Sequence, residues 1–149
     1  MTAITAALAA GALVGGTAAP AHAAKPSWAG KPMVERLPVL ASNPPTFQCG
    51  DRTIRFTSGE VIFQSRELPG RRFLGLIKLR GARATDGTTT YAARGGGSIR
   101  GTQEHAKFRV AITFIARGGN VERVNSVFTF TPNGPPSVVN RGSCTVNEF

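Results

Sequence analysis

The sequence predicts an all-β fold, a mainly antiparallel sandwich or closed barrel of about seven or eight strands with one disulfide. From Phe47 onward, short runs that alternate apolar and polar residues are separated by Gly, Pro, Asn and Asp. No segment carries a convincing helical period, and only two cysteines occur, Cys49 and Cys144. Periodicity does not distinguish a sandwich from a barrel, so both architectures stay open.

Residues 1–23 have the pattern of a secretory signal peptide. An apolar run spans residues 3–16, and Ala21 and Ala23 flank His22 in an A-x-A cleavage pattern. The run is too short to cross a bilayer. We therefore expect cleavage after Ala23 and a secreted, extracellular chain with no membrane span. The run is not preceded by Lys or Arg, so the true start codon stays open.

Residues 24–46 are expected to form an extended, Pro-rich N-terminal arm. This segment holds five prolines and no sustained periodicity. Its Trp28, the only tryptophan of the chain, either anchors the arm on the domain or is exposed. Residues 47–149 are expected to form a single all-β domain, because a chain of this length suits one hydrophobic core.

The first half of this domain alternates strand patterns with turn signals. In its long strand, Phe73, Ile77 and Leu79 fall on one face and Lys78 and Arg80 on the other, with Leu74 and Leu76 also on the basic face. The expected elements are a hairpin of TIRF (53–56) and EVIFQS (60–65) about Ser58-Gly59, a Pro-Gly turn in ELPGRR (67–72), the strand FLGLIKLRGARA (73–84), and a turn at Thr85–Thr88.

The segment YAARGGGSIRG (91–101) places a glycine triplet between two arginines. As a strand, it has small or apolar residues on one side and Arg and Ser on the other. A phosphate-binding loop would need a following helix and a Lys-Ser or Lys-Thr pair, and both are missing. We expect the glycines to serve a bend, a bulge or packing under a phenylalanine of a neighbouring strand. A cavity wall and direct anion binding stay open as alternatives.

The second half of the domain begins with the clearest strand, KFRVAITFIAR (107–117). A turn at residues 118–120 leads to its partner strand, which ends at 133–136, and a last short strand reaches Cys144. The expected inward-facing residues of the two long strands are Phe108, Val110, Ile112 and Phe114, then Val124, Phe128 and Phe130.

The two cysteines are expected to form a disulfide, because the chain is expected in an oxidising compartment and only one pairing is possible. In the chain-entropy model, closing a loop of about 95 residues stabilises a fold by roughly 4–5 kcal/mol. The bond would tie the first strand of the domain to its last.

The formal net charge is +10, which favours long-range attraction to anions. Basic residues recur at alternate positions of several strands, and neighbouring strands would combine them into a strip. We expect this basic face to bind an extracellular polyanion, although a charged face is also how an ordinary sheet meets water. Nucleic acid is disfavoured because aromatic residues are not interleaved with the cations. The basic face comprises Lys78, Arg80, Arg94, Arg100, Lys107 and Arg109.

Two alternatives concern other parts of the domain. A barrel, as a carrier or a lipocalin-like enzyme, could hold a small apolar ligand. The exposed turn at Arg71 and Arg72 could instead fit a trypsin-like protease, as in a secreted inhibitor, although no disulfide braces it nearby. The expected cavity wall of the barrel comprises Tyr91, Gly95, Gly97, Phe108, Val110, Ile112 and Phe114.

Catalysis is not favoured by the residues present, although it stays open. His105 is the only histidine after the signal peptide and adjoins Glu104 in an expected turn, with no second histidine as an acid–base partner. No G-x-S-x-G elbow occurs, and the acidic residues fall almost all at turns or strand ends. One histidine and one disulfide leave no Cys/His metal site, and no cofactor is expected. The sequence leaves the ligand and the oligomeric state open.

Overall fold

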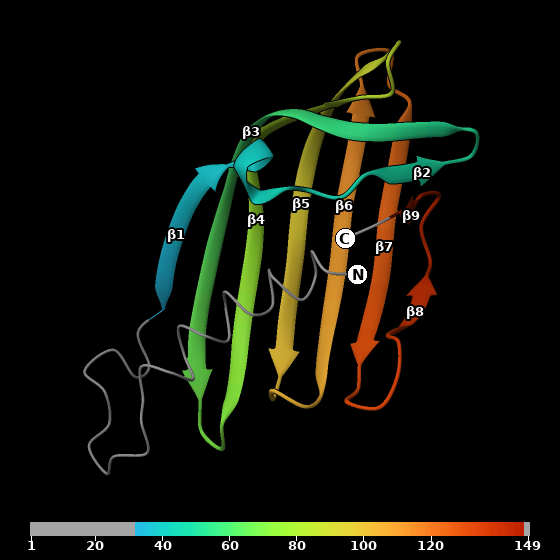
Figure 1. Ribbon diagram of the computed structural model, residues 1–149. Coiled ribbons are helices and arrows are strands. Elements are labelled where there is room, and N and C mark those ends of the chain that lie inside the picture. Colours follow the sequence, from blue (N-terminus) through green and yellow to red (C-terminus); the bar gives the residue numbers. More distant parts are fainter. Residues whose placement is uncertain (1–31, 148–149) are drawn as a thin grey trace.

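The computed structural model describes residues 32–147, which form nine β-strands and one short 3-10 helix (Figure 1). The predicted all-β fold is confirmed. The signal peptide and the first part of the arm lie outside the described residues. The elements are β1 (Met33–Pro38), η1 (Val39–Ser42), β2 (Phe47–Cys49), β3 (Arg52–Leu68), β4 (Arg72–Thr85), β5 (Thr90–Gly101), β6 (Ala106–Ala116), β7 (Val121–Phe130), β8 (Ser137–Asn140) and β9 (Thr145–Val146).

Strands β3 to β8 form an antiparallel meander in chain order (Figure 1). On the side of β3 away from β4, the sheet continues through β2 to β9. The chain then returns to β7, because Cys144, directly before β9, forms an isolated bridge with Val124. The sheet therefore closes nearly into a barrel, which decides between the two expected architectures.

The hairpin expected at Ser58-Gly59 is wrong, because β3 is one continuous strand. Both halves of β3 pair with β4. Phe56, before Gly59, pairs with Ala84, and Glu60, after it, pairs with Arg80. The register shifts between these two pairs, and Gly59 has a φ of 116°. A glycine with positive φ suits a bulge in a strand as well as a turn, so the chain bends here without reversing.

A line of glycines bends the sheet across three neighbouring strands. Gly59, Gly81 and Gly95 all have positive φ and lie at or next to register shifts of β3, β4 and β5. A Cβ atom on Gly95 would lie only 2.1 Å from the carbonyl oxygen of Ala111. The backbones approach so closely that no side chain fits, and the sheet curls there. Above this bend, β3 crosses in front of the sheet (Figure 1).

The hydrophobic core fills the closed half above the bend and extends below it to Val110 and Phe128. Phe47, Phe56 and Phe114 pack ring against ring, with centroids 5.2 to 6.0 Å apart. The inward alternation predicted for β6 is confirmed, since Val110, Ile112 and Phe114 are buried and Phe108 is half-buried. On β7, Val124 and Phe128 are buried and Phe130 is half-buried.

Part of the segment expected as an arm belongs to the folded unit. Strand β1 pairs antiparallel with β3, and the next element, η1, inserts Val39 into the core, where it is 1% exposed. The folded unit therefore includes residues before 47.

The disulfide between Cys49 and Cys144 is confirmed. It joins the end of β2 to the residue before β9, rather than the first strand to the last. Two short strands, β8 and β9, flank Cys144 where one was expected. Because Cys144 also bridges to β7, the bond fastens the barrel where the meander meets its own start.

Candidate functional site

The outer face below the glycine bend is ordered into three cross-strand rows by the pairing register. Residues directly opposite each other in paired strands share a face, so each row can be followed from strand to strand. We call these three rows together the basic surface. The lower row is Arg66, Leu74, Arg100, Lys107, Thr129 and Ser137. The middle row is Val34, Gln64, Leu76, Ser98, Arg109, Val127 and Val139. The upper row is Arg36, Ile62, Lys78, Gly96, Ala111, Asn125 and Arg141, whose backbone N–H donates to the Asn125 carbonyl oxygen.

The basic surface carries seven cations and no carboxylate. The first acidic residue on this face is Glu60, one row above, opposite Arg80. Within residues 32–147 both ion pairs are made by Arg52, which lies elsewhere. The cations of the surface are therefore exposed and have no acidic partner: Arg36, Arg66, Lys78, Arg100, Lys107, Arg109 and Arg141.

Two of these cations face each other directly. Arg100 of β5 is paired with Lys107 of β6, and Arg109 lies two positions further along β6 on the same face. Like charges directly opposite each other in a sheet are destabilising. This repulsion stays in the free protein, and a bound anion would relieve it.

The structure brings together four of the six residues predicted for the basic face: Lys78, Arg100, Lys107 and Arg109. Of the other two, Arg80 lies one row above Lys78, directly before Gly81 of the bend and opposite the acidic Glu60, and Arg94 lies on the outer face on the far side of the bend. Sequence reasoning missed three further cations of the surface. Alternation along β3 could have found Arg66, whereas Arg36 falls in the expected arm and Arg141 lies between β8 and β9, outside a strand.

The residues predicted as a cavity wall lie on the inner face. Tyr91, Val110, Ile112 and Phe114 are buried core residues, and Phe108 stacks on Phe128 with ring centroids 6.1 Å apart. The space beside the two glycines is occupied. A Cβ atom would meet the Ala111 carbonyl oxygen at Gly95, and at Gly97 it would lie 2.7 Å from the Arg109 carbonyl oxygen and 3.0 Å from the Phe108 ring.

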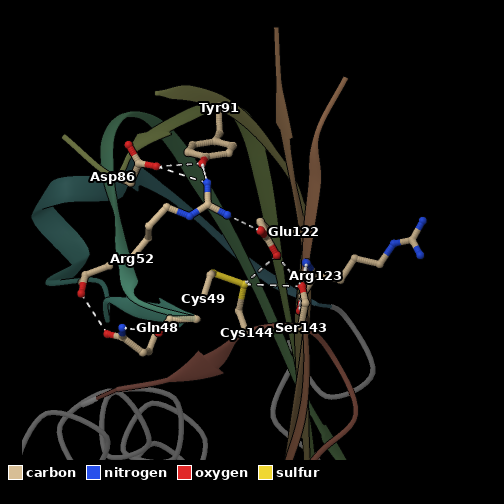
Figure 2. Close-up of a disulfide and its surroundings, with 11 residues drawn as sticks. Gln48, Cys49, Arg52, Asp86, Tyr91, Glu122, Arg123, Ser143 and Cys144 are labelled. Atoms are coloured by element: carbon tan, nitrogen blue, oxygen red, sulfur yellow. Dashed lines mark hydrogen bonds and ion pairs between the residues drawn. A yellow bond between two sulfur atoms is a disulfide. The ribbon is translucent and has the colours of Figure 1, made fainter. Parts of the chain in front are cut away.

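A polar cluster lies beside the disulfide, at the closed end of the barrel (Figure 2). Arg52 donates to Glu122 Oε1 (2.6 Å) and to the Tyr91 hydroxyl oxygen (3.0 Å). The Tyr91 hydroxyl donates to Asp86 Oδ2 (2.9 Å). Ser143 donates to the other oxygen of Glu122 (2.7 Å). Sequence reasoning missed this cluster.

Two groups of the cluster have shifted pKa values. The pKa of Asp86 is held well below its usual range, first by hydrogen bonds from the backbone N–H groups of Thr89 and Thr88 and also by the Tyr91 hydroxyl. The pKa of Tyr91 is raised, mainly by burial and also by the Asp86 carboxylate beside it. Both shifts keep the pair in the form that makes the hydrogen bond, a charged Asp86 and a neutral Tyr91.

The cluster connects segments rather than presenting a reactive group. Its members come from β3, the β4–β5 turn, β5, β7 and the segment before β9, and each polar group is held by another. Cys49, Cys144 and Glu122 place ligand atoms within 4.8 Å of one another, but the two sulfurs are bonded together and are not thiolates. The cluster is therefore a clamp on the closed end of the barrel.

The remaining candidate residues lie in turns or, for Arg72, at the first residue of the strand that follows one. Glu104 and His105 are exposed in the β5–β6 turn, where the His105 backbone N–H donates to Thr102 Oγ1. In the β3–β4 turn, Arg71 has a φ of 57° and Arg72 donates to the Pro69 carbonyl oxygen. Both turns are ordered by local contacts.

No protein-family model, curated protein or solved structure matches this chain. Within the described part of the chain, no helix is long and apolar enough to cross a membrane.

Proposed function

We propose that the protein is secreted and binds an extracellular polyanion through the basic surface. The observation that carries this proposal is the run of seven cations, without a carboxylate, over three consecutive rows. An ordinary solvated sheet face mixes charges of both signs. The disulfide is compatible with an oxidising, extracellular compartment.

The spacing of the cations suits a repeating anionic polymer. Neighbouring strands of a sheet lie about 4.8 Å apart, and alternate residues of one strand lie about 7 Å apart. Arg100 lies one strand spacing from Lys107, and Lys107 and Arg109 are alternate residues of the same strand. Guanidinium groups bind phosphate, sulfate and carboxylate groups through paired hydrogen bonds, so several groups of one polymer can bind at once.

Retention on a heparin column tests the proposal. The variant Arg100→Gln/Lys107→Gln should elute at a lower salt concentration than the wild type. Its matched control is Arg83→Gln/Arg117→Gln, which removes the same charge from exposed positions outside the basic surface and should elute close to the wild type. If both variants lost the same amount of retention, binding would depend on net charge alone. If the wild type were retained no more strongly than a neutral protein, the proposal would be wrong.

A second candidate function is carriage of a small apolar ligand. It is favoured by the inner face below the bend, where Phe63, Phe73, Ile77 and Phe130 are only half-buried. Native mass spectrometry of the purified protein tests it. A co-purified apolar molecule would support carriage, and a bare protein mass after gentle purification would count against it.

A further inference from the structure

The middle row of the basic surface is mostly aliphatic. Val34 is 53% exposed, Leu76 43% and Val139 52%, and Val127 of the same row is half-buried. Seven large hydrophobic residues are exposed in the described part of the chain, and three of them lie in this single row. Exposed aliphatic side chains are therefore concentrated between two rows of cations.

Cations and aliphatic side chains alternate at close range on the central strands. In the lower row, Leu74 lies between Arg66 and Arg100. Leu76 is two positions along β4 from Leu74, on the same face, and Lys78 follows after two more. Long basic side chains lay their methylene stems along apolar neighbours and extend their charged ends beyond them. The surface thus presents apolar groups beneath a layer of positive charge.

We propose that the polyanion is the surface of an anionic lipid bilayer. This inference rests on the proposed function and names the partner of the same site. Interfacial binding combines attraction of cations to anionic headgroups with insertion of apolar side chains at the headgroup boundary. A soluble anionic polymer would use the cations alone and would leave Leu76 and its aliphatic neighbours in water.

The two contributions have separable magnitudes. Each Lys or Arg near an anionic membrane strengthens binding about fivefold, so losing Arg100 and Lys107 should weaken it about 25-fold. Leu76 has less than half of its surface available for transfer, and its loss should weaken vesicle binding about tenfold. The same leucine should make no difference to binding of a soluble polyanion.

Co-sedimentation with vesicles tests this inference, with heparin retention measured in parallel. The vesicles contain phosphatidylcholine and phosphatidylglycerol in equal amounts, or phosphatidylcholine alone. The wild type should bind only the anionic vesicles. Leu76→Gln should lose about tenfold in vesicle affinity with unchanged heparin elution. Its matched control is Val121→Gln, at an outer-face position of equal exposure, 43%, outside the basic surface; it should bind as the wild type does.

The outcomes separate the two proposals. Retention on heparin without binding to anionic vesicles would overturn the lipid inference and leave the proposed function standing. Vesicle affinities that are equal for the wild type and Leu76→Gln would also overturn it, in favour of a soluble polyanion. Absence of both activities would remove the proposed function itself. Circular dichroism of each variant establishes that a loss of binding is not a loss of fold.

Discussion

Substitution of Arg52 by Gln should open the clamp at the closed end of the barrel. The guanidinium group donates to Glu122 and to Tyr91, and lies 3.6 Å from Asp86. Removal leaves the Asp86 side chain, which is 1% exposed, without its ion-pair partner. The change is therefore expected to destabilise the contact between β3 and β7.

The magnitude follows from the exposure of Arg52. Hydrogen bonds to charged groups contribute about 1.5–3 kcal/mol each when they are sheltered. The Arg52 side chain is 41% exposed, so solvent screening reduces this contribution. We expect a loss of about 1–2 kcal/mol in the free energy of unfolding, and about 4 °C in Tm for each kcal/mol.

Urea unfolding with the disulfide intact measures the effect. The matched control is Arg55→Gln, which removes the same charge from an exposed position of the same strand. It should change the free energy of unfolding by less than about 0.5 kcal/mol. If the two variants were equally stable, the cluster would not act as a clamp.

Three further predictions concern stability. The pKa of Asp86 is lowered in the folded state, so the stabilising effect of the Asp86 carboxylate is fully present above the unfolded pKa of about 3.9 and is lost as pH falls through the lower folded pKa. The difference in free energy of unfolding between the wild type and Asp86→Asn should therefore shrink below about pH 4. A difference that does not depend on pH would contradict this. Gly95→Ala should cost more than about 2 kcal/mol in urea unfolding, because a Cβ atom there would lie 2.1 Å from a carbonyl oxygen of β6, whereas Gly134→Ala, with open space around it, serves as the neutral control. The variant Cys49→Ser/Cys144→Ser should lose roughly 2–5 kcal/mol in the same assay, and an unchanged denaturation midpoint would refute the role of the bond in closing the barrel.

The strands and their faces could be predicted because alternation is a local property. Alternation with the neighbouring residues predicts an inward face for Tyr91 and Phe114, and both are buried. The bend at Gly59 could not be predicted in this way. A glycine with positive φ suits a turn and a bulge equally, and only the pairing of both halves of β3 with β4 decides between them.

The clamp and the full basic surface depend on contacts that are remote in the sequence. Arg52 meets Glu122 across 70 residues and Tyr91 across 39, and no local pattern marks such partners. Alternation assigned Lys78 and Arg109 to outward faces correctly. The row in which each residue lies is set by the register of the whole meander. Bulges at the glycines shift this register by one residue.

The salt dependence of heparin binding measures how many cations of the basic surface bind the polyanion. Counterion release makes the logarithm of the affinity fall linearly with the logarithm of the salt concentration, by roughly one unit of slope for each cation engaged. Fluorescence anisotropy with labelled heparin fragments should give a slope shallower by about two for Arg100→Gln/Lys107→Gln than for the wild type. Arg83→Gln/Arg117→Gln should keep the wild-type slope. Equal slopes for all three proteins would contradict the assignment of polyanion binding to the basic surface.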